Sequence, residues 1–146
     1  VQQPIVRALL PHAKAMPCAQ QLVEHCDARG IPMALVTSSS LEAVTFKALP
    51  HPWLKRITER VYGDDPELEA GKPDPAPFLL AAHRLGLDPN RCWALEDSQA
   101  GAASALAAGC RVWVLNEQRP TEPRDVNPRH INSLGVVLDQ LLNKDD

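Results

Sequence analysis

The fold is decided by one stretch of the sequence, CWALEDSQAGAASALAAG at residues 92–109. Its first four residues form a short apolar run, which is typical of a buried strand, and the acidic pair Glu96–Asp97 ends that run. Ser98 is a suitable N-cap for a helix of small residues that Gly109 stops. A helix of small residues can approach a sheet closely. The stretch therefore predicts a β-strand followed directly by an α-helix.

The same alternation of strand and helix continues on both sides of this stretch. Apolar runs at 33–37 and 111–115 predict two more strands, and Val61-Tyr62 is a weaker candidate. Residues 116–129 hold three prolines and many charges, so we expect a surface loop there. Further helices are expected to begin at Pro17, Leu41, Asp74 and Leu134. This pattern predicts an α/β fold with three layers, in which helices cover both faces of a Rossmann-like parallel sheet.

Composition favours one globular domain and excludes several partners. The chain has 146 residues, of which 45% are apolar and 23% charged, a balance typical of a packed core. The formal net charge is −3 and no run of Lys or Arg occurs, so neither nucleic acid nor a membrane surface is an expected partner. No apolar stretch approaches the ~20 residues of a membrane span. We expect a soluble, cytoplasmic protein.

The four cysteines, Cys18, Cys26, Cys92 and Cys110, show no CxxC spacing. Two fall in apolar helical patterns and two lie beside the expected strands. Buried, reduced thiols are therefore favoured over a zinc site or a set of disulfides.

Polar residues follow the expected strands at the points where a ligand would bind. In a parallel sheet, ligands lie outside the carboxyl ends of the strands. One strand ends at Thr37-Ser38-Ser39, another ends at Glu96-Asp97, and Lys72 stands between Gly71 and Pro73 just before a helix. Hydroxyl and amide groups can bind phosphate oxygens, a lysine can neutralise their charge, and carboxylates can hold Mg²⁺. The set predicts a site for a phosphoryl group and its metal.

Each of these features also has an ordinary structural interpretation. Thr37 to Ser40 would serve as the end of a strand followed by a helix cap, and Lys72 would serve as a solvated loop residue. Glu96 and Asp97 would be favoured beside a helix N-terminus by its dipole. Their order along the chain, and the strand or helix beside each, favour the functional interpretation.

Three segments together resemble the haloacid dehalogenase (HAD) superfamily, in particular its phosphatase and β-phosphoglucomutase-like branch. They are ALVTSSS (34–40), GKPDPAPFLLAAHRLGLDP (71–89) and ALEDSQAGAASALAAG (94–109). The family's second motif is a Thr or Ser at a strand end, its third is the lysine of G-K-P, and its fourth is an acidic pair followed by S-x-A-G. The similarity covers roughly residues 15 to 142.

The resemblance implies a role for each matching residue. Thr37 and the amide of Ser38 would bind the phosphoryl oxygens, and Lys72 would stabilise that charge and steady the nucleophile. Asp97 would coordinate Mg²⁺, with Glu96 sharing the task. The implied reaction forms a phosphoaspartate, which is hydrolysed in a phosphatase or returned to the substrate in a mutase. The expected substrate is a small phosphorylated metabolite.

The sequence departs from the family in its first motif. No D-x-D occurs in the 146 residues, although this motif supplies the nucleophile and the general acid. Its strand would lie in the middle of the sheet, between the strands that end at Thr37 and Leu95. The helical cap domain is absent too, apart from a last piece or linker at residues 1–14. We therefore expect residues 15–146 to be a partial core from a fragment or truncated product, inactive alone. Either the neighbouring strands close the gap, or the central strand is supplied by another chain, through strand exchange or a dimer, or by an unseen segment.

Three other interpretations of the sequence compete with the HAD one. The seven glycines never form G-x-G-x-x-G, which excludes a dinucleotide-binding domain. A response-regulator receiver has its acidic pair first in the chain, whereas here the pair comes last. A non-catalytic HAD-like binding or regulatory domain that has lost its nucleophile remains open. Sugar phosphates, phosphoglycolate and nucleotides all remain open as substrates.

Overall fold

The computed structural model describes residues 18–144. The predicted last piece of a cap at 1–14 therefore lies outside the described residues, as does Pro17, where the first helix was expected to begin. Short 3-10 turns at Pro52–Arg56 and Pro89–Arg91 join the main elements. Those are α1 (Ala19–Ala28), β1 (Ala34–Val36), α2 (Leu41–Ala48), β2 (Glu59–Val61), α3 (Ala76–Leu85), β3 (Trp93–Glu96), α4 (Gln99–Ala108), β4 (Arg111–Leu115), β5 (Arg129–Ile131) and α5 (Gly135–Lys144).

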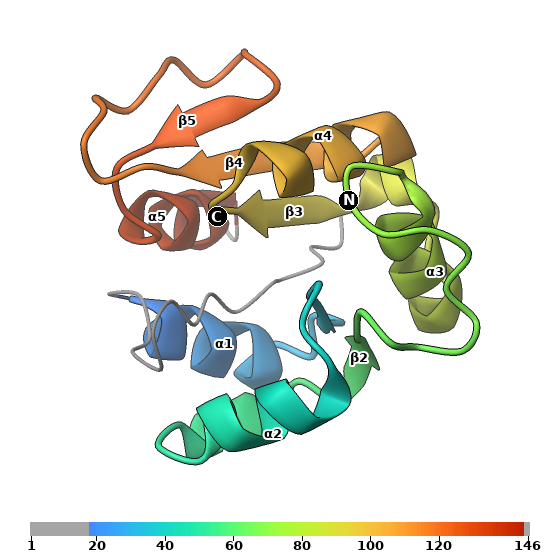
Figure 1. Ribbon diagram of the computed structural model, residues 1–146. Helices are drawn as coiled ribbons and strands as arrows, with labels where there is room; N and C mark the ends of the chain where they lie inside the picture. Colours follow the sequence, from blue (N-terminus) through green and yellow to red (C-terminus); the bar gives the residue numbers. More distant parts are fainter. Residues whose placement is uncertain (1–17, 145–146) are drawn as a thin grey trace.

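All described strands run parallel, in two separate sheets (Figure 1). One sheet pairs β1 with β2, and the other has the order β3-β4-β5. This confirms the predicted α/β class with a parallel sheet. Within the described part of the chain, β1 and β3 belong to different sheets. These are the two strands between which the strand of the family's first motif is expected.

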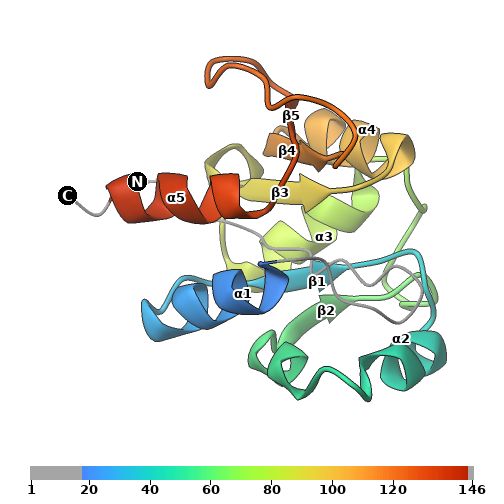
Figure 2. The ribbon, with the colours of Figure 1, turned by 90° about the vertical axis from the view of Figure 1, so that its left-hand side faces the viewer.

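Helices cover both faces of the strands, and each face has its own core (Figure 2). Side chains alternate along a strand, so Leu35 and Leu95 pack on the face covered by α1 and α5. Ala94 and Val36 pack on the opposite face, against α3 and α4. Each core takes residues from both sheets and thereby ties the two sheets together. Glu96, two positions after Ala94, points to the α3–α4 face.

Two strands differ from the sequence-based expectation. The weak candidate at Val61-Tyr62 is β2, which begins two residues earlier, at Glu59. The expected loop at 116–129 ends in a strand that was missed, β5, whose first residue is Arg129. This strand has only three residues, Arg-His-Ile, and two of them are polar, so it does not form the apolar run from which the other strands were predicted. Arg129 is nevertheless buried, and its guanidinium lies 5.2 Å from the Trp113 ring centre, within the range of a cation–π contact.

The capping residues act as predicted. Ser98 Oγ accepts a hydrogen bond from the Gly101 amide at 3.0 Å, and Ser40 Oγ accepts one from Ala43 at 3.1 Å. Gly109 ends α4 with a φ of 96°, a left-handed conformation that favours glycine. All four cysteines are free, and burial raises the pKa of Cys26 to about 12. Among the described residues, no helix has the length and apolar character that crossing a bilayer requires.

An arginine on α3 fastens the loop that follows β2. Arg84 donates to both carboxylate oxygens of Asp65, at 2.6 and 3.0 Å, and to Glu67 at 2.8 Å. It also donates to the carbonyl oxygen of Arg60 at 3.0 Å. These bonds hold the pKa of Asp65 below its ordinary value of 3.8. The loop is thus fixed to α3 by a bidentate, largely buried ion pair.

We predict that Asp65→Asn lowers the free energy of unfolding by about 1.5–3 kcal/mol at pH 7, because it removes a charge-assisted bidentate contact. Since the folded-state pKa of Asp65 is lowered, the contact stabilises the fold fully above about pH 4 and is lost as the pH falls further. The gap between wild type and variant should therefore shrink in acid. Urea titrations across this pH range measure it.

The control is Glu67→Gln, which removes the exposed partner of the same arginine and should change stability by less than about 0.5 kcal/mol. Equal losses for the two variants would contradict the assigned role of Asp65.

Candidate active site

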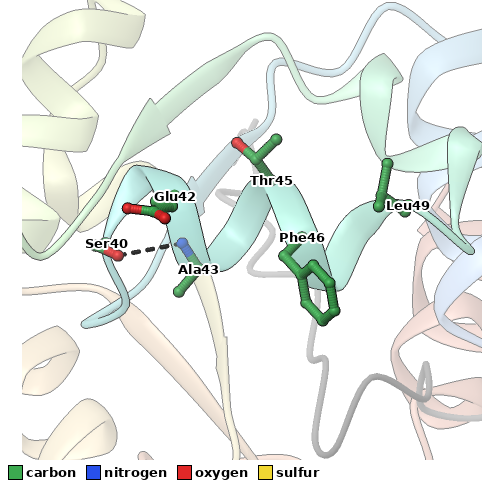
Figure 3. Close-up of a pocket in the computed structure, with 6 residues that line it drawn as sticks. All are labelled: Ser40, Glu42, Ala43, Thr45, Phe46 and Leu49. Carbon is green, nitrogen blue, oxygen red and sulfur yellow. Dashed lines mark hydrogen bonds between the residues drawn. The ribbon is translucent and has the colours of Figure 1, made fainter.

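A tight turn after β1 carries the first predicted site residues. The Thr37 amide donates to the Val61 carbonyl at 3.0 Å, and Thr37 Oγ1 accepts from the Ser39 amide at 3.1 Å. Ser38, at the tip of the turn, is exposed. Ser40 then caps α2, as Figure 3 shows for its bond to Ala43. Because the Thr37 oxygen already accepts one hydrogen bond, its proton remains able to donate to a ligand.

The loop after β2 supports this turn from below. The Gly63 amide donates to the Ser39 carbonyl at 2.8 Å, and Asp64 Oδ1 accepts from the Leu41 amide at 3.0 Å. A Cβ at residue 63 would overlap the Ser38 carbonyl, so only glycine fits this approach. Sequence reasoning missed both Gly63 and Asp64. Their available signal was a glycine followed by two aspartates after a weak strand.

Lys72 connects the two sheets through its ammonium group. Its Nζ donates to Glu96 Oε2 at 2.8 Å and to the Val36 carbonyl at 3.2 Å. The Lys72 side chain is 4% exposed and that of Glu96 is fully buried. The ammonium also lies 5.4 Å from the Phe78 ring centre on α3. Val36 is the last residue of β1 and Glu96 the last of β3, so Lys72 bridges the carboxyl ends of both strands.

The start of α4 makes room for the Glu96 carboxylate. Ser98 Oγ lies 3.5 Å from Glu96 Oε1. A Cβ at residue 101 would overlap both that oxygen and the carboxyl carbon, so Gly101 is needed for the carboxylate to sit here. Sequence reasoning gave Gly101 no role of its own. The signal was a glycine inside a helix, which costs about 1 kcal/mol relative to alanine and usually has a packing reason.

Asp97, which was expected to bind a metal, is exposed just after the end of β3. Within residues 18–144, no group of three or more His, Cys, Asp or Glu side chains is close enough to hold a metal ion. Mg²⁺ usually takes only one or two carboxylates, and substrate phosphates and waters complete its shell. The pair fits that need in part, because one Glu96 oxygen is engaged by Lys72.

Three predicted segments thus meet at one place. Lys72 contacts Glu96 and the carbonyl that directly precedes Thr37, and Asp97 follows Glu96. The arrangement offers a hydroxyl, exposed backbone groups, a buried ammonium and a solvent-facing carboxylate around the carboxyl ends of β1 and β3. Such a set can bind a phosphoryl group and neutralise its charge. The described residues supply no nucleophile of the D-x-D type.

Comparison with known proteins gives consistent results. The profile of the haloacid dehalogenase-like hydrolases matches residues 4–109. Hexitol phosphatase A of Escherichia coli is 38% identical over 131 residues, covering 87% of this chain and 54% of that protein. The mitochondrial (DL)-glycerol-3-phosphatase 1 of Arabidopsis thaliana is 31% identical over 146 residues, covering 97% of this chain and 47% of that protein.

Solved structures share the fold. A HAD family hydrolase from Deinococcus radiodurans, crystallised with bound phosphate and sodium, superposes with a TM-score of 0.72 at 25% identity, over 89% of this chain and 60% of that one. The chain spans about half the length of the curated relatives that it matches. The family match extends over most of the sequence and includes all three site segments. This chain therefore belongs to the haloacid dehalogenase-like hydrolase family.

Proposed function

We propose that this chain is the greater part of the catalytic core of a Mg²⁺-dependent phosphatase for a small phosphorylated metabolite. The observation that carries the proposal is the buried ion pair between Lys72 and Glu96. Removing two charges from water is costly, and a purely structural domain gains little from such a pair. Placed where two parallel strands end, beside a turn rich in hydroxyls, the pair is suited to holding an ammonium ready for a phosphoryl group.

Each residue of the site has one proposed task. The Thr37 hydroxyl and the Ser38 amide donate hydrogen bonds to the phosphoryl oxygens. Lys72 neutralises the charge on the transferring group, and Glu96 keeps the ammonium in position. Asp97 would hold Mg²⁺, directly or through water, and Glu96 would share that task. When bound, the metal supplies further neutralisation of phosphate charge.

The nucleophile is proposed to come from a segment outside these 146 residues, because no D-x-D occurs within them. A strand that inserts in parallel between β1 and β3 would satisfy the facing edges of both sheets and would end beside Lys72. The segment belongs either to the same polypeptide or to a second copy by strand exchange. The lengths of the relatives favour the same polypeptide.

The proposed chemistry has two steps. An oxygen of the aspartate attacks phosphorus, the bond from phosphorus to the substrate oxygen breaks, and the leaving alkoxide takes a proton from the second aspartate of D-x-D. The second aspartate then takes a proton from a water molecule, whose oxygen attacks the phosphorus of the aspartyl phosphate; the bond from phosphorus to the aspartate oxygen breaks, which releases inorganic phosphate and restores the first carboxylate. Throughout, Thr37, Ser38 and Lys72 stay on the phosphoryl oxygens.

The substrate is proposed to be a phosphorylated polyol or sugar. The E. coli relative is named for hexitols, and one Arabidopsis relative is named for glycerol 3-phosphate. A non-catalytic HAD-like binding domain is the second candidate, favoured only by the absence of D-x-D from the sequence. Such a domain needs neither the buried ammonium nor the glycine that makes room for Glu96, and the enzyme proposal accounts for both.

We predict that the 146-residue chain alone does not hydrolyse p-nitrophenyl phosphate in the presence of Mg²⁺, because it lacks the nucleophile. A fusion that adds the part of E. coli hexitol phosphatase A not covered by the alignment should gain hydrolysis, and EDTA should abolish it. Release of p-nitrophenol measures both. The control is the same fusion with the first aspartate of D-x-D changed to asparagine.

Turnover by the chain alone would refute an external nucleophile. A folded fusion that binds Mg²⁺ and phosphate yet hydrolyses no phosphate ester would favour the non-catalytic domain.

A second prediction concerns the buried pair. Lys72→Met and Glu96→Gln should each lower the free energy of unfolding by about 3–5 kcal/mol, because each leaves a buried partner without its counter-charge. The double variant should lose clearly less than the sum of the two. Urea unfolding of the four proteins measures the coupling energy.

The exposed pair of Arg56 with Asp27, at 2.6 Å, serves as the matched control. The same cycle on that pair should give a coupling of at most about 1 kcal/mol. Additive losses at Lys72 and Glu96 would show that their contact does not hold the lysine.

A further inference from the structure

A pocket of about 580 Å³ opens at the carboxyl ends of β3 and β4, next to the proposed phosphoryl site. Asp97 and Gln99 form one wall, residues 116–119 form a second, and His130 of β5 contributes a third. The arrowheads of the three strands in Figure 1 point toward this edge of the sheet. The volume lies within the range of small-molecule sites, which is about 300–1,000 Å³. None of the tasks assigned above uses this pocket beyond Asp97.

The second wall is a turn that is built by a side chain. Asn116 Oδ1 accepts from the Gln118 amide at 3.0 Å, and the Asn116 carbonyl accepts from the Arg119 amide at 3.2 Å. The Asn116 amide donates to the carbonyl of Ile131 at 2.9 Å, which anchors the turn to β5. The backbone of the wall is therefore held in place before any ligand binds, so a ligand would not bear the cost of ordering it.

His130 is held from behind by a residue that does not line the pocket. Glu122 Oε1 lies 2.7 Å from His130 Nδ1 and accepts from the His130 amide at 2.7 Å. Because a carboxylate only accepts, Nδ1 carries the proton, and the Nε2 edge of the ring is left for other partners. The imidazole is thus fixed in orientation, as in a preformed binding site.

The lining is polar and carries charges of both signs. Asp97 and Glu117 are acidic, Arg119 and His130 are basic, and Gln99 and Gln118 bring amides that both donate and accept. Two apolar residues, Val114 and Leu115, also line the space. A second phosphate would meet two carboxylates here, and an apolar chain would leave the polar groups unpaired. Many hydroxyls on a carbon chain satisfy donors and acceptors alike and can also pack on the apolar patch.

We propose that this pocket binds the hydroxyl-bearing carbon chain of the substrate while the phosphoryl group occupies the site at Thr37 and Lys72. The proposal rests on the proposed function, since it places the two parts of one substrate. Gln118 and Arg119 are the specificity-determining residues, because they lie on the turn and have no part in the phosphoryl site. Asp97 stands where the two sites join.

Amide chemical shifts of the 146-residue chain with Mg²⁺ test the proposal, using three ligands. Inorganic phosphate should shift the amides of Thr37 to Ser39 only. Sorbitol 6-phosphate should also shift those of Gln118, Arg119 and His130, and it should bind at least about fivefold more tightly than pentyl phosphate, which has no hydroxyls beyond its phosphate. Gln118→Ala with Arg119→Gln should reduce that preference to less than about twofold.

The matched control is Arg124→Gln, an exposed arginine on the same loop that does not line the pocket, which should keep the preference. If phosphate shifts Thr37 to Ser39 while sorbitol 6-phosphate leaves the pocket amides unmoved, or gains no affinity over pentyl phosphate, the pocket proposal is overturned and the proposed function stands. If phosphate leaves Thr37 to Ser39 unmoved, the proposed function fails, and with it the placement of one substrate across both sites.

Discussion

The buried contact between Lys72 and Glu96 is the constraint on which the rest of the site depends. It joins a loop to the last residue of β3, and the Val36 carbonyl ties the same ammonium to the end of β1. Two sheets that share no backbone ladder are thus connected at the edge where a ligand would bind. The contact also requires glycine at residue 101, because any side chain there would displace the Glu96 carboxylate. Under the proposed function, an ammonium held in this way would act on a phosphoryl group from a dry environment, where charges interact most strongly.

Much of the fold could be predicted from the sequence, because its signals are local. Ser98 and Gly109 mark both ends of α4, and the apolar run at 111–115 coincides with β4. The strand β5 could not be predicted, because what stabilises it is not in its own three residues. It exists because β4 offers an edge and because Trp113 packs against the Arg129 guanidinium. Such strands are stabilised by tertiary packing, and their sequences show no regular alternation of apolar and polar residues.

The candidate site shows the same division. Thr37, Lys72, Glu96 and Asp97 were identified because each stands at the end of an apolar run or beside a helix start, and the structure brings their segments to one edge. The sequence could not show whether Lys72 pairs with Glu96 or with Asp97. The alternation of side chains along β3 decides this, because it turns Glu96 toward the face that holds Lys72. The support from Gly63 was missed for a similar reason. Its closeness to Ser38 depends on the register of β1 with β2, which no local pattern fixes.

Burial of the thiols has a practical consequence. Three of the four cysteines are buried, whereas Cys18 is partly exposed just before α1. Alkylating reagents should therefore select Cys18 without any engineering, since the thiolate forms poorly at the buried positions. Its sulfur lies close to Gly135 at the start of α5. Here α5, which follows the sheet β3-β4-β5, contacts α1, which precedes the sheet β1-β2. A fluorophore attached there would report on the contact between α1 and α5.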